Sequence, residues 1–531
     1  MNPDFNIQNT VPKAFWYHVN QKPESVANWQ KLQGIWQPQT WEQYGQLAKQ
    51  IGLALKSSGM KKGDKISILS QCRMEWVACD MGIIGIGGVT APIYHSNTSE
   101  QIRYIAEHSE AKFIFLEDQE QLDKILKIWN QVSNVKKLIV FDSYAPKDIP
   151  NVTLFSEFVQ TGVDDHSFEK HIDKSDPNDV ISFIYTSGTT GNPKAGMITN
   201  SNVISSIQHL PKILDITQKD LTVAYLPLAH IAERLLGHFL KLVYGNQTAF
   251  AESIEDMPNN IRQVGPSILF GTPRVFEKFY AKIATGISDA SWIQKKIYHW
   301  AIGIGKEISI AKGSNSFFLK LKVWLAKYLI YNKIKDIFGG RIRYMISGAA
   351  PISPKILNFF KWMNITILEG YGMTETTGII SINLPHAVKI GSVGKPYPNT
   401  KVKIAEDGEI CVIAPQNIEN YFKNKEATDR LLEADNNGKY WLHTGDVGYI
   451  DDDGYLFITD RKKDILITAG GKNVAPQYIE NLLKTIPYLS QSMVYGDAKP
   501  YLTALITLDD DEITKFARDQ KILYQDLADL S

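Results

Sequence analysis

The chain has 531 residues, too many for one hydrophobic core, so we expect one large domain of several lobes together with smaller domains. Basic and acidic residues number 57 each, and this balance argues against a general nucleic-acid-binding protein, which carries a strong basic excess. Three scattered cysteines favour neither a disulfide framework nor a zinc site, and they predict a reducing, cytoplasmic location.

The first 180 residues alternate between helical and strand patterns. A helix is predicted after Thr40, because Tyr44, Ile51 and Leu55 then fall on one face. Helices at 74–85 and 99–109 separate strands at 65–70, 89–94 and 112–116. This alternation predicts an α/β fold with parallel strands and helical crossovers. The longest apolar run, 81–93, is too short and too interrupted by glycine to span a bilayer, so we expect a soluble or peripheral protein.

A loop rich in glycine and hydroxyl groups follows the apolar run 180–184, which is typical of a buried strand. Backbone N–H groups, short O–H donors and one lysine are what a polyphosphate needs, so the loop predicts a phosphate site. It is not a Walker A motif, because Ala195 follows the lysine. The alternative is a flexible surface loop without a ligand. The predicted phosphate-binding residues are Thr186, Ser187, Gly188, Thr189, Thr190, Gly191 and Lys194.

The segment 186–194 resembles the phosphate-binding signature of the AMP-forming adenylating enzymes, which include acyl-CoA synthetases, luciferases and peptide-synthetase adenylation domains. Further motifs follow in the family's order over nearly the whole chain and are most similar to those of long-chain fatty acyl-CoA synthetases. The resemblance implies ligation of a fatty acid to coenzyme A with ATP and Mg²⁺, and it is compatible with a homodimer. It also implies two doubly wound sheets at 1–390, a small β-barrel lobe at 391–460, a hinge at 461–463 and an α+β C-terminal domain at 464–531.

Two segments of the middle region bear on the substrate. Residues 226–234 resemble the long-chain family's substrate-pocket motif, so we expect His230 to line the acyl or adenylate pocket; an ordinary core histidine is the alternative. Residues 281–336 form a predicted helical insert rich in lysine and tryptophan. Helices with a basic and an aromatic face can lie on an anionic membrane, which predicts peripheral contact at the inner face of a membrane. The insert could equally pack on its own core.

Two strand-to-loop transitions predict the adenylate site, because open α/β sheets bind ligands at such points. The first contains Gly348, expected in both the nucleotide and acyl pockets, and Ala349. In the second, the resemblance implies that Tyr371 stacks on adenine, that Thr374 binds the α-phosphate and that Glu375 binds Mg²⁺ together with Thr186. The alternative is a buried structural Tyr-Gly pair with a solvated glutamate. The second motif also assigns Glu369, Gly370 and Gly372 to the nucleotide.

The last third of the chain carries the remaining predicted residues. Short alternating strands at 401–404, 409–413, 448–450 and 455–459 predict the β-barrel lobe. The resemblance implies that Asp446 binds the ribose, that Arg461 lies near the ribose and phosphate, and that Lys463 is the pivot. Rotation about that pivot would bring Gly470 and Gly471 to the thioester step. The predicted catalytic residues are Lys194, Thr374, Glu375 and Arg461.

The family's C-terminal domain ends in a segment with a lysine that reaches the substrate carboxylate, and no such segment precedes Ser531. The resemblance therefore predicts a truncated domain and a slow adenylation step. Three functions remain open. The first is a long-chain fatty acid–CoA ligase, and the second is another AMP-forming enzyme, which either ligates medium-chain or aryl acids or loads an acid onto a carrier protein. The third is a non-catalytic protein that binds a nucleotide or an acyl-adenylate.

Overall fold

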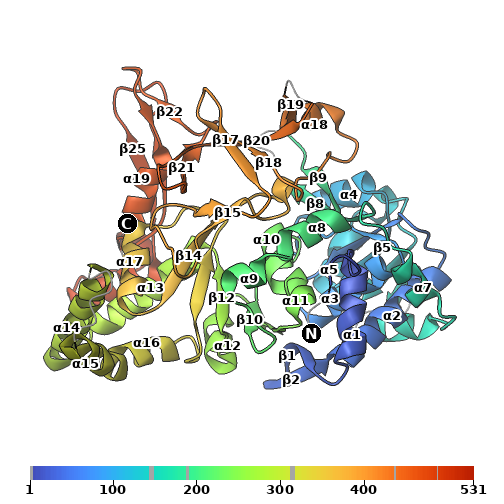
Figure 1. Ribbon diagram of the computed structural model, residues 1–531, viewed down its shortest axis with the longest axis horizontal. Helices are drawn as coiled ribbons and strands as arrows, with labels where there is room; N and C mark the ends of the chain where they lie inside the picture. The colour runs from blue at the N-terminus through green and yellow to red at the C-terminus, as the bar shows by residue number, and fades with distance from the viewer. Residues whose placement is uncertain are drawn as a thin grey trace. The chain divides into compact units, whose positions relative to one another are not determined.

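The computed structural model describes residues 4–142, 149–186, 191–310, 317–435, 438–486 and 488–530 (Figure 1). Contacts divide the chain into two interleaved compact units. The first unit consists of Met1–Phe270, Gly372–Ile380 and Ile413–Tyr440, and the second of Gly271–Tyr371, Ser381–Val412 and Trp441–Ser531. The domain boundaries at 390, 460 and 463 stay predictions.

The described residues of the first unit contain a sheet of seven strands in the order β7-β6-β5-β3-β4-β8-β9. Its strands are parallel except β9, which pairs antiparallel with β8. Parallel strands covered on both faces are largely apolar, as β5 illustrates, in which five of the six residues are buried. The strands are β3 (Lys65–Leu69), β4 (Val89–Thr90), β5 (Ala111–Leu116), β6 (Lys137–Val140), β7 (Val152–Leu154), β8 (Val180–Thr186) and β9 (Lys194–Thr199).

A second sheet within the described part of this unit has the order β10-β11-β1-β2. Strands β10, β11 and β1 are parallel, and β2 is antiparallel to β1. The predicted α/β class with helical crossovers is therefore confirmed. The strands are β1 (Val26–Leu32), β2 (Ile35–Thr40), β10 (Leu221–Ala224) and β11 (Gln247–Phe250); β12 (Ile268–Gly271) leads into the second unit.

Local capping and close packing explain where the first unit's helices lie. Helix α2 begins after Thr40, as predicted, and Thr40 caps it through a reciprocal capping box with Gln43. In α3, a Cβ atom at Gly82 would lie 2.7 Å from the Ala48 carbonyl oxygen, so glycine permits the close crossing of α2 and α3. The helices are α1 (Val11–Gln21), α2 (Trp41–Ser57), α3 (Met74–Gly85), α4 (Ser99–His108), α5 (Gln119–Leu126), α6 (Phe155–Phe158), α7 (Ser167–Asp173), α8 (Asn200–Ile207), α9 (Leu210–Leu214), α10 (Ile231–Glu233), the π-helix η3 (Arg234–Phe239), α11 (Lys241–Tyr244), α12 (Met257–Val264) and α18 (Lys425–Leu431).

The second unit combines a mixed sheet with antiparallel lobes. Parallel β13 and β14 are followed by antiparallel β15 and β16, and β18, β20 and β21 form consecutive antiparallel pairs. Two hairpins, β22–β23 and β24–β25, build the C-terminal region. The strands are β13 (Tyr344–Ser347), β14 (Thr366–Tyr371), β15 (Ser381–Ile382), β16 (Lys395–Pro396), β17 (Lys401–Ile404), β18 (Glu409–Ile413), β20 (Tyr440–Ile450), β21 (Leu456–Arg461), β22 (Leu466–Ile467), β23 (Asn473–Val474), β24 (Leu489–Tyr495) and β25 (Thr503–Leu508).

The helices of the second unit include the predicted insert. Figure 1 shows α14, α15 and α16 gathered in one helical group. Among the described residues, no helix has the length and apolarity needed to cross a membrane. The helices are α13 (Pro273–Ser288), α14 (Trp292–Ile310), α15 (Phe317–Ala326), the π-helix η4 (Lys327–Tyr331), α16 (Asn332–Asp336), α17 (Pro354–Trp362), α19 (Pro476–Leu483) and α20 (Asp510–Asp519).

A buried ionic network holds the π-helix η3 against the first unit's sheets. The Arg234 guanidinium donates to the Asp80 carboxylate, and both side chains are fully buried. Asp80 also accepts from the Thr90 hydroxyl at 2.6 Å and from His238 Nε2 at 3.0 Å. Burial alone would raise the pKa of Asp80, but Arg234 and His238 hold that pKa below its usual value. Asp80 is therefore a buried anion whose stability depends on these partners.

Acidification should destabilise this network through His238. Burial lowers the pKa of His238 to about 4, although Asp80 opposes the shift. The unfolded chain, with an ordinary pKa near 6.5, binds the proton first, so stability is lost as the pH falls from about 6.5 towards 4. We expect His238 to contribute about 2–3 kcal/mol to this loss, since one pKa unit corresponds to roughly 1.4 kcal/mol.

Urea unfolding between pH 7 and pH 4.5 measures the loss. His238→Gln keeps an N–H donor for Asp80 but does not titrate, so its unfolding free energy should fall less steeply with acid than that of the wild type. Equal pH slopes for the two proteins would show that His238 is not the titrating group.

Candidate functional site

The two arms of the predicted phosphate loop lie side by side in the first unit. Strand β8 ends at Thr186, β9 begins at Lys194, and these two residues are paired in the antiparallel ladder. Gly191 has φ of 102°, a conformation that favours glycine. Ser187, Gly188, Thr189 and Thr190 lie outside the described residues, so their predicted role stays a prediction. The two ends of the loop, Thr186 and Lys194, are therefore adjacent, and Lys194 begins the second arm.

The predicted adenylate loop folds back on itself in the same unit. A Cβ atom at Gly372 would lie 2.2 Å from the Gly378 carbonyl oxygen, so only glycine fits there. The Gly378 amide donates to the Met373 carbonyl at 2.9 Å, which closes the loop. Thr374 and Glu375 are nearly buried, at 9% and 6% exposure. The loop thus holds both predicted catalytic side chains in a rigid turn.

Tyr421 connects this loop to the phosphate loop. Its hydroxyl donates to the Glu375 carboxylate, and its ring centroid lies 5.4 Å from Lys194 Nζ. Burial, followed by the Glu375 charge, raises the pKa of Tyr421 well above its usual value, so the hydroxyl stays protonated. One aromatic side chain therefore contacts two of the three predicted catalytic residues of the first unit, Glu375 and Lys194.

Backbone pairing explains how Tyr421 reaches that position. The segment around it runs beside β9: the Phe422 amide donates to the Ala195 carbonyl at 2.9 Å, and the Met197 amide donates to the Asn420 carbonyl at 3.3 Å. The Ile418 amide also donates to the Glu375 carbonyl at 2.8 Å. Sequence reasoning missed Tyr421, and the tyrosine-phenylalanine pair between polar stretches was the only available signal.

The second unit assembles the other predicted nucleotide residues around Asp446. The Tyr371 hydroxyl donates to Asp446 Oδ2 at 2.6 Å, and Arg461 Nε lies 2.9 Å from Asp446 Oδ1. Asp446 faces Arg461 because β20 and β21 pair in that register. Burial raises the pKa of Asp446, and the Arg461 guanidinium opposes the rise. Tyr371, Asp446 and Arg461 are therefore brought together although 75 and 90 residues separate Tyr371 from the other two.

The remaining nucleotide residues of β13 and β14 have different surroundings. The Glu369 carboxylate accepts from the Gly391 amide at 3.0 Å, and burial raises its pKa to about 8, so it is mostly protonated at neutral pH. Gly370 lies against Ile382 of β15. Gly348 is followed by Ala349 with φ of 68°, a strained conformation for a residue with a Cβ atom. Strain of this kind is common where backbone groups meet a ligand.

The predicted hinge and thioester residues lie at the surface of the second unit. Strand β21 extends to Arg461, the first residue of the predicted hinge, and Lys463 follows in an exposed turn. Gly470 and Gly471 are exposed at the tip of the β22–β23 hairpin. The pivot and thioester roles stay predictions.

His230 caps α10 in the first unit. Its Nδ1 atom accepts from the Ala232 amide at 3.2 Å, and burial lowers its pKa, so the ring is neutral at neutral pH. The acyl-pocket role stays a prediction. Arg234, four residues on, is fully buried and paired with Asp80.

The donor set in the first unit fits Mg²⁺. Mg²⁺ is commonly held by one or two carboxylates together with substrate phosphates, and Glu375 offers one carboxylate beside a predicted phosphate loop. Within the described ranges, the one three-residue cluster with metal-ligand spacing is Asp164, His166 and Glu169. Both of its carboxylates are paired with Lys49 at 2.7 Å, which accounts for their proximity without a metal.

Comparison with known proteins adds independent information. The model of the AMP-binding enzyme family matches residues 15–422. The long-chain-fatty-acid–CoA ligase ACSBG2 of Xenopus laevis is 33% identical over 94% of this chain and 69% of its own length. The long-chain-fatty-acid–CoA ligase FadD15 of Mycobacterium tuberculosis is 32% identical over 94% of this chain and 82% of its own length.

Solved structures share the fold. The anthranilate CoA ligase AuaEII in complex with anthranoyl-AMP matches with a TM-score of 0.74 at 18% identity, over 97% of this chain and 91% of that one. The fatty acyl CoA synthetase of Mycobacterium tuberculosis matches with a TM-score of 0.67 at 21% identity, over 98% and 92%. At these identities the structural likeness supports the fold alone.

Proposed function

This chain belongs to the AMP-binding enzyme family, and we propose that it is an AMP-forming ligase that joins a long-chain fatty acid to coenzyme A. The observation that carries the proposal is the identity above 30% with long-chain-fatty-acid–CoA ligases over 94% of the chain. The contacts that Tyr421 makes with Glu375 and Lys194, and those of Asp446 with Tyr371 and Arg461, support it.

Two chemical steps make up the proposed reaction. A carboxylate is a poor acyl donor because its leaving group would be oxide. Attack of one carboxylate oxygen on the α-phosphorus of ATP forms the acyl-adenylate and releases pyrophosphate, so that the leaving group becomes AMP. The coenzyme A thiolate then attacks the acyl carbon, forming the thioester and releasing AMP.

The first unit's residues would act on the phosphates. Lys194 places a positive charge at the second arm of the phosphate loop, and Thr374 offers a hydroxyl donor for the α-phosphate. Glu375, with Thr186, would hold Mg²⁺, which when bound neutralises charge on the phosphate oxygens. The Tyr421 hydroxyl donates to the Glu375 carboxylate and would orient it, while the Tyr421 ring lies against Lys194. These residues would stabilise the charges on the phosphates, and the covalent bonds would form and break only between the substrates.

The second unit's residues would hold the nucleoside of ATP. Asp446 can accept from ribose hydroxyls while Tyr371 and Arg461 fix its orientation. The aromatic face of Tyr371 suits stacking on the adenine base. Lys463 would be the pivot that brings Gly470 and Gly471 up for the thioester step.

Thiol-dependent AMP release with palmitate, benzoate and acetate tests the proposed function. Because each buried CH₂ contributes about 0.8 kcal/mol, palmitate should be the best of the three substrates. Preference for benzoate or acetate would identify a different acid ligase. ATP binding without AMP release under any condition would identify a non-catalytic binder.

We also propose that the helical insert rests on an anionic membrane surface. Its aromatic side chains are unusually exposed: Trp292 67%, Phe317 75%, Phe318 74%, Trp324 62% and Tyr328 71%. Exposed lysines lie among them, including Lys296, Lys320 and Lys327. Such a surface gains free energy from aromatic burial and about 1 kcal/mol from each lysine near anionic lipid.

Co-sedimentation with phosphatidylserine-containing vesicles measures the membrane contact. The wild type should bind at low salt, and Phe317→Ser with Trp324→Ser should weaken binding by at least about tenfold, since each aromatic side chain contributes roughly 1.5–3 kcal/mol when buried. Tyr501→Ser is the matched control, because Tyr501 is 70% exposed outside the insert. Absence of wild-type binding at low salt would exclude this contact.

A further inference from the structure

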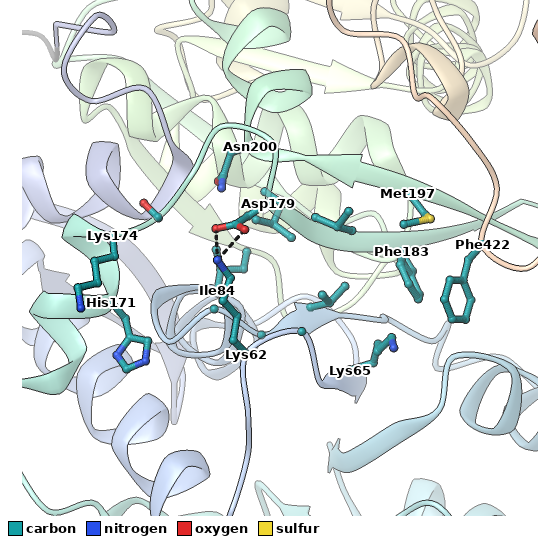
Figure 2. Close-up of a pocket in the computed structure, with 17 residues that line it drawn as sticks. Lys62, Lys65, Ile84, His171, Lys174, Asp179, Phe183, Met197, Asn200 and Phe422 are labelled. Carbon is teal, nitrogen blue, oxygen red and sulfur yellow. Dashed lines mark hydrogen bonds and ion pairs between the residues drawn. The ribbon is translucent and has the colours of Figure 1, made fainter.

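The first unit contains a cleft that the proposed reaction does not use. It has a volume of about 460 Å³, within the range of small-molecule sites, and it opens between the β4–β8–β9 edge of the sheet and α7. Figure 2 shows Lys174 and His171 at one end, the Lys62–Asp179 ion pair in the middle, and Phe183, Met197 and Phe422 at the other end.

One end of the cleft is apolar. The Phe183 and Phe422 rings pack at 4.6 Å between centroids, and Met197 lies beside them. Ile84 and Ile181, which are 3% and 2% exposed, form part of the floor. These side chains can cover a hydrocarbon segment of a ligand.

The other lining groups are predominantly cationic. The lining contains three lysines and one carboxylate: Lys62 is paired with Asp179 at 2.7 Å. Lys65 lies at the apolar end, 5.1 Å from the Phe422 ring centroid and 3.4 Å from Glu110. Lys174 forms no ion pair within the part of the chain that the structure describes, and it is exposed at the mouth of the cleft. An anionic ligand group at that end could therefore form an ion pair with Lys174.

Strand alternation separates this cleft from the predicted phosphate site. Successive side chains point to opposite faces of a strand. Lys194 and Gly196 lie on the face of β9 where a Cβ atom at Gly196 would be 3.6 Å from Thr374. Met197 lies on the opposite face, in the cleft. Likewise Tyr421 contacts Glu375, whereas its neighbour Phe422 lines the cleft.

We propose that this cleft is a second ligand site, which binds an anionic amphiphile: an acyl chain against Phe183, Met197 and Phe422, and its acidic head group at Lys174. Two sources share this chemistry, a free fatty acid and an acyl thioester of coenzyme A. The choice of these two sources rests on the proposed function, while the site itself rests on the lining residues.

Thiol labelling of Met197→Cys tests the site directly. The natural cysteines are all buried, and burial raises the pKa of Cys72 and Cys79, so they react slowly. The protein is first saturated with an acyl-adenosine sulfamate, an adenylate analogue, so that added ligand reports on the cleft alone. Oleate or oleoyl-CoA at ten times its dissociation constant should slow labelling of Cys at this position about tenfold. Protection by one ligand and not the other identifies the source.

Charge variants decide whether the head group is recognised. Lys174→Glu should raise the half-protecting concentration roughly fivefold or more, whereas Lys219→Glu, an exposed lysine outside the cleft, should leave it unchanged. The proposal is overturned if neither ligand slows labelling, if Lys174→Glu has no effect, or if neutral oleyl alcohol protects as well as oleate. Val180→Cys, also in the lining, replaces Met197→Cys if that variant fails to fold.

The two proposals fail in different ways. If the sulfamate neither binds nor blocks AMP formation, the proposed ligase function is wrong whatever the labelling shows. If the sulfamate binds but oleate and oleoyl-CoA give no protection, the ligase function stands and the second site does not exist.

Discussion

Glu375→Gln should slow pyrophosphate–ATP exchange about 10²–10³-fold and raise the Mg²⁺ concentration needed for half-maximal rate. Glutamine keeps an acceptor for the Tyr421 hydroxyl but lacks the charge that would hold a divalent cation on the phosphates. The unfolding midpoint should stay close to that of the wild type, because the loop's backbone hydrogen bonds are unchanged.

Two comparisons make the Glu375 result specific. Tyr421→Phe removes only the hydroxyl and keeps the ring beside Lys194, so a smaller loss of about tenfold is expected. Glu419→Gln, an exposed change two residues before Tyr421, should leave exchange unaffected. A Glu375→Gln protein with wild-type exchange and wild-type Mg²⁺ dependence would remove Glu375 from the reaction.

Arg234→Met should lower the free energy of unfolding by about 3–5 kcal/mol. Methionine fills much of the same space, but it leaves the fully buried Asp80 carboxylate without its charged partner. Arg234 also donates to the Ser182 hydroxyl at 2.5 Å and lies over Trp76, so the π-helix η3 loses several contacts at once. Urea unfolding at pH 7 measures the change.

A double mutant separates the charge from the packing. In Asp80→Asn with Arg234→Met the unpaired charge is gone, and part of the lost stability should return. Arg262→Met, an exposed change on α12, should have an effect within about 0.5 kcal/mol. A loss below about 1 kcal/mol for Arg234→Met would mean that Asp80 is neutral in the folded protein.

Local sequence patterns predicted many elements closely. The helix Met74–Gly85 and the strands Lys401–Ile404 and Glu409–Ile413 begin and end at the predicted residues. Periodicity, capping residues and turn residues act over a few positions, which is why they can be read along the chain. The long strand Tyr440–Ile450 was predicted only in part, because its first half carries the Trp441–Asp446 motif that is typical of a turn.

The sequence by itself determined the α/β class, the order of the motifs and the family, and thereby the identities of Lys194, Thr374, Glu375, Asp446 and Arg461 as candidates. The tertiary structure alone decided which residues contact them, Tyr421 on Glu375 and Tyr371 on Asp446, and it alone decided that Arg234 pairs with Asp80. Each of these contacts joins residues 46 to 154 positions apart. The local sequence pattern predicts which face of a helix or strand a side chain occupies. Which residue it contacts there depends on strand order and register, and these are set only when the whole chain packs.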